Sequence, residues 1–340
     1  MKIYNIENIN NKIKVGDEIE IKMVNNKKDN IKKLKILDYC GEGGYGTVFK
    51  CDLNGVECVI KFSTNENPKF LKGCYTHLKK DLKEFVVDIT YAGELIDNED
   101  DYNYYSIMNY GGRDLKHFDF SNENKIDNSY FIIQQLFLLA KKICKTKKMV
   151  MDFKLSNILL DEYNKITITD IYFESDNFKS FNNCKIFRTN AVLDINVIKS
   201  HKEKNYNFTY IYVLLMFIFI NIFCVDSLNN ISQKIIKELK LDIDTKKFTN
   251  IIQLSYYSKF NHKDMKIKSF LKTNKKNLKI KNFNNIYDLF NSHIKIKKIY
   301  SDILNKNEFV NILDNILIPI PEYRDIEPLK KFMKKIKITL

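Results

Sequence analysis

Four glycines and one lysine near the start of the chain have the types and spacing needed to bind phosphate. Gly41–Val48 reads G-E-G-G-Y-G-T-V, and Lys61 follows 15 residues after Gly46, at the end of Cys58-Val59-Ile60-Lys61. Because glycine has no Cβ, phosphate oxygens can approach its backbone N–H groups closely. A lysine ammonium can bind the same oxygens as a point charge. The segment therefore predicts a site for nucleotide phosphates.

The residues after the glycines distinguish between two kinds of phosphate loop. Thr47–Asp52 alternates in polarity and favours a strand, and a turn at Asn54-Gly55 leads into a second strand. A dinucleotide-binding loop needs a helix there, with an acid about twenty residues further on. The order strand, glycine turn, strand, hairpin, strand with lysine favours a mononucleotide loop instead.

A second set of polar residues has the types needed for phosphoryl transfer. Asp152, Lys154 and Asn157 lie in one short run, and Asp170 ends the strand-like Ile166–Asp170. These residues offer a base for a hydroxyl, a cation for the transferring group and two oxygen ligands for Mg²⁺. Each acid alone is typical of an exposed turn, but their order and spacing behind the glycine loop predict a catalytic loop.

Composition limits the possible classes of protein. A chain of 340 residues that is 44% hydrophobic can bury a substantial core, in one two-lobed domain or two small ones. The net charge of +14 would suit nucleic acid, acidic membranes or acidic peptides, but the lysines are scattered, which favours a solvated surface. Seven cysteines without C-x-x-C spacing disfavour disulfides and zinc and indicate a reducing, cytoplasmic compartment.

The distribution of glycine predicts an α+β fold, because all ten glycines lie at or before Gly112. The first third should be rich in strands and the remainder in helices. The expected strands are Lys33–Cys40, Thr47–Asp52, Glu57–Ser63, Phe85–Leu95 and Tyr104–Tyr110. The expected helices are Asn67–Lys83, Ser129–Thr146, Asn207–Val225, Ser232–Leu239, Ile286–His293 and Glu308–Leu317. Phe208–Val225 is apolar enough to cross a bilayer, but Thr209, Asn221 and the lack of orienting charges favour a buried helix.

These motifs together resemble the eukaryotic-type protein kinase superfamily, over about Lys33 to Lys331. Gly41–Val48 resembles the glycine loop, Val59-Ile60-Lys61 the V-A-I-K strand, and Asp152–Asn157 the D-L-K-x-x-N loop. Asp170 resembles the metal-binding aspartate of D-F-G. The G-G-R-D-L that ends Tyr105–Leu115 is similar to the casein-kinase-1, vaccinia-related-kinase and haspin branches. Together with the Lys-, Asn- and Ile-rich composition, this favours a poxvirus-type source.

The resemblance implies a two-lobed kinase fold that binds ATP and Mg²⁺ and phosphorylates serine or threonine in a protein substrate. It implies an N-terminal extension over residues 1–32, a β-rich lobe over 33–110, a helical lobe over 111–332 and a basic tail over 333–340. It places the phosphates at Gly41, Gly43, Gly44, Tyr45, Gly46 and Lys61, and the adenine at Val48, Val59, Met108, Tyr110 and Leu159. Asp152 would accept the hydroxyl proton, Lys154 would steady the γ-phosphoryl group, and Asn157 and Asp170 would hold Mg²⁺.

The glutamate that pairs with the lysine in this family has two candidate equivalents. Cys74, Leu78, Asp81 and Phe85 fall on one helical face, which predicts an inward-pointing Asp81 as the partner of Lys61. Glu84 is the alternative. A membrane partner is not favoured, and neither is a nucleic acid partner, although the basic surface leaves the latter open.

The chain departs from the family at several positions. Val150-Met151 replaces H-R of H-R-D, Asp170-Ile171-Tyr172 replaces D-F-G, and Asn207-Phe208-Thr209 stands where an aspartate usually anchors the catalytic loop. These departures keep two other functions open. One is a nucleotide-binding pseudokinase that acts as a scaffold, and the other is a small-molecule kinase of the aminoglycoside or choline type. The four glycines and Lys154 favour a protein kinase.

Overall fold

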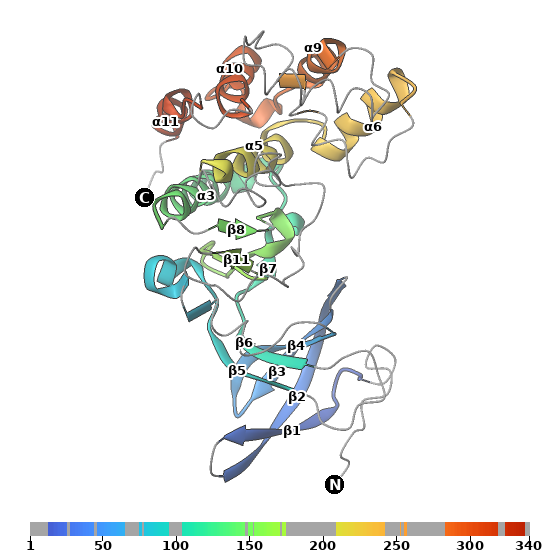
Figure 1. Cartoon of the computed structure of the whole chain (residues 1–340), viewed down its shortest axis with the longest axis vertical. Coiled ribbons are helices and arrows are strands. Elements are labelled where there is room, and N and C mark those ends of the chain that lie inside the picture. Colours follow the sequence, from blue (N-terminus) through green and yellow to red (C-terminus); the bar gives the residue numbers. More distant parts are fainter. Residues whose placement is uncertain are drawn as a thin grey trace. The chain divides into compact units, whose positions relative to one another are not determined.

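The computed structural model describes residues 13–25, 28–43, 46–64, 75–76, 78–94, 104–146, 149–151, 153–170, 172–174, 209–241, 252, 255–256, 283–318 and 324–336. The fold is α+β, as expected, and the chain forms two compact units (Figure 1). The first unit comprises Met1–Gly112 and Thr167–Thr169, and the second comprises Arg113–Ile166 and Asp170–Leu340.

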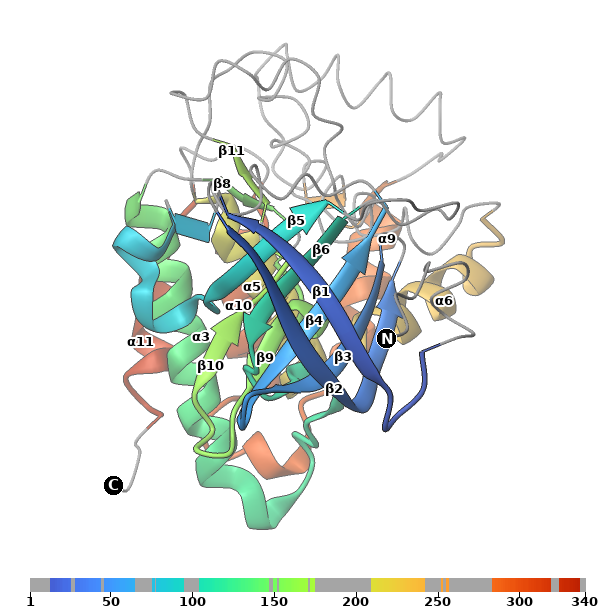
Figure 2. The ribbon, with the colours of Figure 1, turned by 90° about the horizontal axis from the view of Figure 1, so that it is seen from below.

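The first unit contains a six-stranded antiparallel sheet in the order β1-β2-β3-β4-β6-β5 (Figure 2). Its strands are β1 (Glu18–Asn25), β2 (Lys28–Gly43), β3 (Gly46–Leu53), β4 (Val56–Ser63), β5 (Ile89–Glu94) and β6 (Tyr104–Asn109). The strands expected from the sequence are confirmed, except that Phe85–Leu95 is a strand only from Ile89 onward, because Lys83–Phe85 forms a 3-10 turn. β1 lies within residues 1–32, so the expected extension supplies a strand of the sheet.

Alternation along the strands gives this sheet one apolar face. That face consists of Ile19, Leu34, Ile36, Phe49, Cys51, Cys58, Ile60, Phe62, Tyr105 and Ile107. Because side chains alternate between faces, the residues between them on β3, β4 and β6 lie on the opposite face.

A segment distant in sequence completes the first unit. Ile168 forms an isolated parallel bridge with Val86, and its carbonyl accepts a hydrogen bond from the Val87 N–H. The hydroxyls of Tyr75 and Thr169 lie 3.5 Å apart.

The second unit is mainly helical. Its helices are α3 (Ile126–Thr146), α5 (Tyr210–Phe223), α6 (Leu228–Glu238), α9 (Phe283–His293), α10 (Lys306–Ile316) and α11 (Glu327–Met333). Short strands accompany them. β7 (Arg113–Asp114) and β9 (Ile158–Leu160) form one sheet with β10 (Ile166–Ile168), of which only Ile166 belongs to the second unit. β11 (Tyr172–Glu174) pairs with β8 (Met149–Met151). The expected tail over residues 333–340 is not separate at its start, since Ile336 is buried and its carbonyl accepts a hydrogen bond from Gln134 on α3.

The apolar segment after residue 207 forms the centre of the second unit. Thirteen of the fourteen residues of α5 are buried, which explains why this helix is apolar on every side. At its end, the Phe223 ring makes edge contacts with Tyr300, Phe309 and Phe332, with ring centres 5.1 to 5.9 Å apart. The buried-helix prediction is therefore confirmed. Within the described part of the chain, no helix has both the length and the apolarity that a membrane span requires.

Candidate nucleotide and phosphoryl-transfer site

The glycine turn joins two antiparallel strands. Gly43 at the end of β2 pairs with Gly46 at the start of β3, and the strand continues directly through Val48. The predicted strand after the turn is thus confirmed, and this is not the strand-to-helix turn of a dinucleotide-binding loop. Gly44 and Tyr45, which connect the two strands, lie outside the described residues.

Two of these glycines are required by the backbone itself. A Cβ on Gly46 would lie 2.0 Å from the carbonyl oxygen of Phe62 on β4, far inside van der Waals contact. Gly41 has a φ of +149°, beside a register shift in the pairing of β2 with β3. L-residues rarely adopt this backbone conformation. These two glycines therefore shape the turn whether or not a phosphate is bound.

Four of the predicted nucleotide-binding residues, Val48, Val59, Lys61 and Met108, lie on the sheet face opposite the apolar core, whereas Leu159 lies in β9 of the second unit. Register pairs Val48 with Lys61 and Lys61 with Ser106, which places three side chains in one row across β3, β4 and β6. In the neighbouring row, Val59 pairs with Met108. Directly opposed side chains have Cβ atoms about 5 Å apart, so these residues form one continuous patch.

Lys61 is the most informative member of this patch. Its side chain is only 6% exposed, and the flanking Ser106 and Met108 are 3% and 4% exposed. Lysine is rarely buried to this degree, because removing an ammonium group from water is costly unless polar groups compensate. A buried lysine on the sheet face away from the core marks a candidate binding site for an anionic group.

Tyr110, expected beside the adenine, has a contact that the sequence did not reveal. Lys50 Nζ lies 4.4 Å from the centre of the Tyr110 ring and 2.8 Å from Glu57 Oε1. The hydrogen bond to Glu57 raises the pKa of Lys50, and the ionisable hydroxyl of Tyr110 adds a smaller electrostatic contribution. One face of the Tyr110 ring is therefore covered by a cation.

The prediction that Asp81 points inward is wrong. The side chain of Asp81 is exposed, whereas Leu78, Leu82 and Phe85 are buried. The buried face of this helical segment therefore passes through residue 82 rather than residue 81. Glu84, the alternative, is also exposed. A pairing of Lys61 with either acid stays a prediction.

The second unit holds the predicted phosphoryl-transfer residues. Lys154 immediately precedes the 3-10 turn η4 (Leu155–Asn157), and its carbonyl accepts the Asn157 N–H at 3.0 Å. Asn157 is 8% exposed and leads directly into β9, where Leu159 pairs with Asp114. Asp152 lies outside the described residues.

Asp170 has an unusual backbone conformation. Its φ is +52°, in the left-handed region that residues other than glycine enter at a cost of about 1–3 kcal/mol. Tyr172, where the family has glycine, lies in β11 and is not among the described residues with positive φ. The pairing of Met151 with Tyr172 joins the strand that precedes Asp152 to the strand that follows Asp170.

Two residues that sequence reasoning missed hold the strands around this segment. The buried Tyr210 hydroxyl, at the start of α5, donates a 2.6 Å hydrogen bond to the carbonyl of Val150 on β8. Gln135 on α3 donates to the Asn164 carbonyl at 2.7 Å and accepts the Ile166 N–H at 3.1 Å, which fixes the turn between β9 and β10. The apolar helix was predicted, but the partner of a tyrosine on it was not predictable from spacing.

Arg324 contributes a further link to the start of α5. Its guanidinium donates to the Ile318 carbonyl at 2.9 Å and to the Thr209 hydroxyl at 3.2 Å. Thr209 immediately precedes Tyr210, so Arg324 bonds to the residue before the tyrosine that contacts Val150.

Asn157 and Asp170 offer two oxygen ligands, which is enough for magnesium bound together with a nucleotide. Magnesium commonly takes one or two protein carboxylates and completes its shell with phosphate oxygens and water. In the described residues, no group of three or more His, Cys, Asp and Glu side chains gathers into a metal site. The donor set of Asn157 and Asp170 thus fits a metal that arrives with phosphates.

A scan against models of protein families matches none of them, and a search of curated proteins finds no match to this chain.

Proposed function

We propose that this chain is an ATP-dependent protein kinase that phosphorylates serine or threonine, with a two-lobed kinase-like fold. The observation that carries the proposal is the buried Lys61, which lies beside Val48 on the face of the sheet opposite the core. A strand–glycine turn–strand unit precedes it. The same chain carries Asp152, Lys154, Asn157 and Asp170 in the order that phosphoryl transfer requires.

Each residue then has a separate task. Gly43, Gly44 and Gly46 allow the phosphates to approach the backbone, and Lys61 holds them through its charge. Asp152 orients the substrate hydroxyl and accepts its proton, while Lys154 stabilises the charge on the transferring group. Magnesium, when bound by Asn157 and Asp170, neutralises negative charge on the phosphates.

The conformation of Asp170 supports this assignment. Strained backbone persists only where the surrounding structure enforces it, and such positions cluster at functional sites. Asp170 has this conformation two residues after the end of β10 and two residues before β11. A role as metal ligand gives the strain a reason.

The cysteines support a cytoplasmic location. Among the described residues, Cys40, Cys51, Cys58, Cys144 and Cys224 are all free thiols. Burial raises the pKa of the Cys51 and Cys224 thiols to about 12, so both stay protonated and unreactive at neutral pH. Such thiols suit a reducing compartment, and we place the protein there.

The test is a transfer assay with the purified full-length chain, Mg²⁺, labelled ATP, casein and a basic protein. We expect transfer to a serine or threonine hydroxyl and a rise in melting temperature with Mg²⁺-ATP. Asp152→Asn should lower transfer at least about a hundredfold while the ATP-induced rise remains. The matched control is Asp302→Asn, the same chemical change at an exposed position of the second unit, which should retain activity.

Three outcomes would contradict the proposal in different ways. A lack of both transfer and thermal shift would refute nucleotide binding altogether. A shift without transfer would favour the pseudokinase. Transfer to an aminoglycoside or choline but not to protein would favour the small-molecule kinase.

A further inference from the structure

The second unit contains a cavity of about 680 Å³ beside the segment that carries Lys154. Lys154, Leu155 and Ser156 form part of its wall. The remaining wall comes from residues 115–121, the last turns of α5, the first turn of α6 and Lys297. A cavity of this volume is in the size range of ligand sites.

The charged lining of the cavity is mainly positive. The charged residues of the lining are three lysines, Lys116, Lys154 and Lys297, and one carboxylate, Asp119. Asp119 already accepts the Ser121 N–H at 2.9 Å, and Lys297 donates to the Ile222 carbonyl at 2.8 Å. The first turn of α6 adds the partial positive charge of a helix N-terminus. The lining therefore favours an anionic group.

The rest of the lining is apolar. Phe118, Phe120, Phe217, Ile218 and Leu228 contribute side chains to the wall. The rings of Phe118 and Phe120 meet edge to face, with centres 4.7 Å apart. A ligand that fills the cavity must therefore combine an apolar group with a negative charge.

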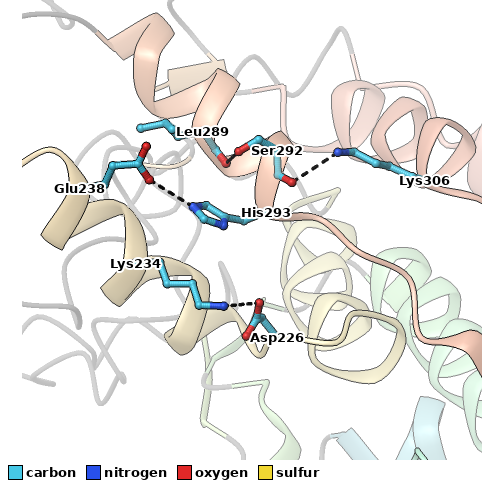
Figure 3. A network of polar contacts seen from close by, with 7 residues as sticks. All are labelled: Asp226, Lys234, Glu238, Leu289, Ser292, His293 and Lys306. Carbon is cyan, nitrogen blue, oxygen red and sulfur yellow. Dashed lines mark hydrogen bonds and ion pairs between the residues drawn. The ribbon is translucent and has the colours of Figure 1, made fainter.

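Polar contacts hold the wall in place. Asn221 on α5 donates to the Phe217 carbonyl and accepts the Leu228 N–H, and so ties α5 to the start of α6. Figure 3 shows the next contacts along α6: Lys234 lies 2.6 Å from Asp226, and Glu238 lies 3.5 Å from His293 on α9. A cavity held in this way exists before its ligand arrives, which lowers the entropic cost of binding.

We infer that this cavity binds a segment of the substrate polypeptide that carries an aromatic or large aliphatic side chain next to an aspartate or glutamate. The inference rests on the proposed function, because Lys154 belongs to both the catalytic loop and the cavity wall. The occupant follows from charge complementarity: three lysines and one aspartate disfavour a basic segment, and the aromatic wall disfavours a purely polar one.

The experiment uses two fluorescent peptides that contain one serine and one phenylalanine and differ only in having glutamates or lysines around them. Binding to the full-length chain is measured by anisotropy without ATP, and phosphorylation is measured separately. The test variant is Lys116→Glu, an exposed lysine of the wall. The matched control is Lys298→Glu, an equal charge change at an exposed lysine beside Lys297 but outside the wall.

We expect the acidic peptide to bind roughly tenfold more tightly than the basic one, with this preference weakened by salt. Lys116→Glu should weaken its binding roughly tenfold and raise KM with kcat unchanged, whereas Lys298→Glu should behave as the wild type. Equal effects of the two variants, or a preference for the basic peptide, would overturn the inference. If a single-stranded oligonucleotide displaces the acidic peptide from the wild type, and the oligonucleotide does not bind Lys116→Glu, the ligand of the cavity is a nucleic acid and not a peptide.

The two proposals fail separately. Binding of the acidic peptide that depends on Lys116 but leads to no phosphoryl transfer would keep the cavity assignment and refute the kinase. Transfer that is indifferent to flanking charge and to Lys116 would keep the kinase and refute the cavity assignment.

Discussion

Replacing Tyr210 with phenylalanine tests whether the hydroxyl on α5 holds the strand that leads into the catalytic loop. The change keeps the buried ring and removes the hydroxyl that donates the 2.6 Å hydrogen bond to the Val150 carbonyl. A typical hydrogen bond contributes about 0.5–1.5 kcal/mol, and leaving its buried acceptor unsatisfied raises the loss to about 1–3 kcal/mol. We expect Tyr210→Phe to lower the free energy of unfolding by that amount.

The measurement is urea denaturation followed by circular dichroism at 222 nm, a standard signal of helix. With an m-value of about 3 kcal/mol/M, the expected loss moves the midpoint down by about 0.3–1 M. Because Val150 lies two residues before Asp152, we also expect kcat to fall about tenfold or more while KM for ATP changes little.

Tyr212→Phe is the matched control, since it removes a hydroxyl from a buried tyrosine on the same helix. Its ring packs against Phe137, and within the described part of the chain no hydrogen bond from its hydroxyl is found. It should shift the midpoint by less than about 0.2 M. The reasoning is refuted if both variants unfold at the same urea concentration, or if Tyr210→Phe loses stability without any loss of kcat.

Three further predictions concern the first unit. Gly46→Ala should lower the free energy of unfolding by about 3 kcal/mol or more, because its Cβ would meet the Phe62 carbonyl. The control Gly55→Ala has open space around its Cβ but a φ of +83°, and it should lower the free energy of unfolding by only about 1 kcal/mol. Equal losses of the two variants in urea melts would contradict this prediction. Lys61→Met should lower transfer at least about a hundredfold and abolish the ATP-induced thermal shift without lowering the melting temperature of the free protein; a retained shift would show that Lys61 does not bind phosphate. The Cys51 thiol has its pKa raised from 9.0 to about 12, so its contribution to stability is complete below pH 9 and lost as the pH rises toward 12. Other buried thiols such as Cys224 lose stability over the same range, so we expect Cys51→Val to lose about 1.4 kcal/mol less than the wild type between pH 7 and 10, in urea melts at both pH values.

The strands were predictable where local pattern and tertiary contact agree. Thr47–Asp52 alternates apolar and polar residues, and it forms β3 as expected. β1 was not predicted, although Glu18–Met23 also alternates charged and apolar residues, and its pairing with the start of β2 shows it to be a strand. Ile19 and Leu34, which face each other across that pair, then join the apolar core.

In the candidate site too, some residues could be placed from local sequence pattern and others could not. The strand residues that share a face with Lys61 follow from period-two alternation, which the sequence displays directly. Asp81 was misplaced because several helical faces fit a short segment, and only packing selects the one that carries Leu82. Tyr210 bonds to a residue 60 positions earlier in the chain, a distance over which no local spacing rule operates.

The contribution of Thr167–Thr169 to the first unit has a consequence for how the protein is made. A fragment that ends at Gly112 would lack the segment that bridges to Val86. On the ribosome, the 57 residues from 113 to 169 must be added before the first unit can be completed. At about 5–20 residues per second, this takes about 3–11 s. The first unit therefore stays without Thr167–Thr169 for this time, while most of the helix-bearing chain is still to be synthesised.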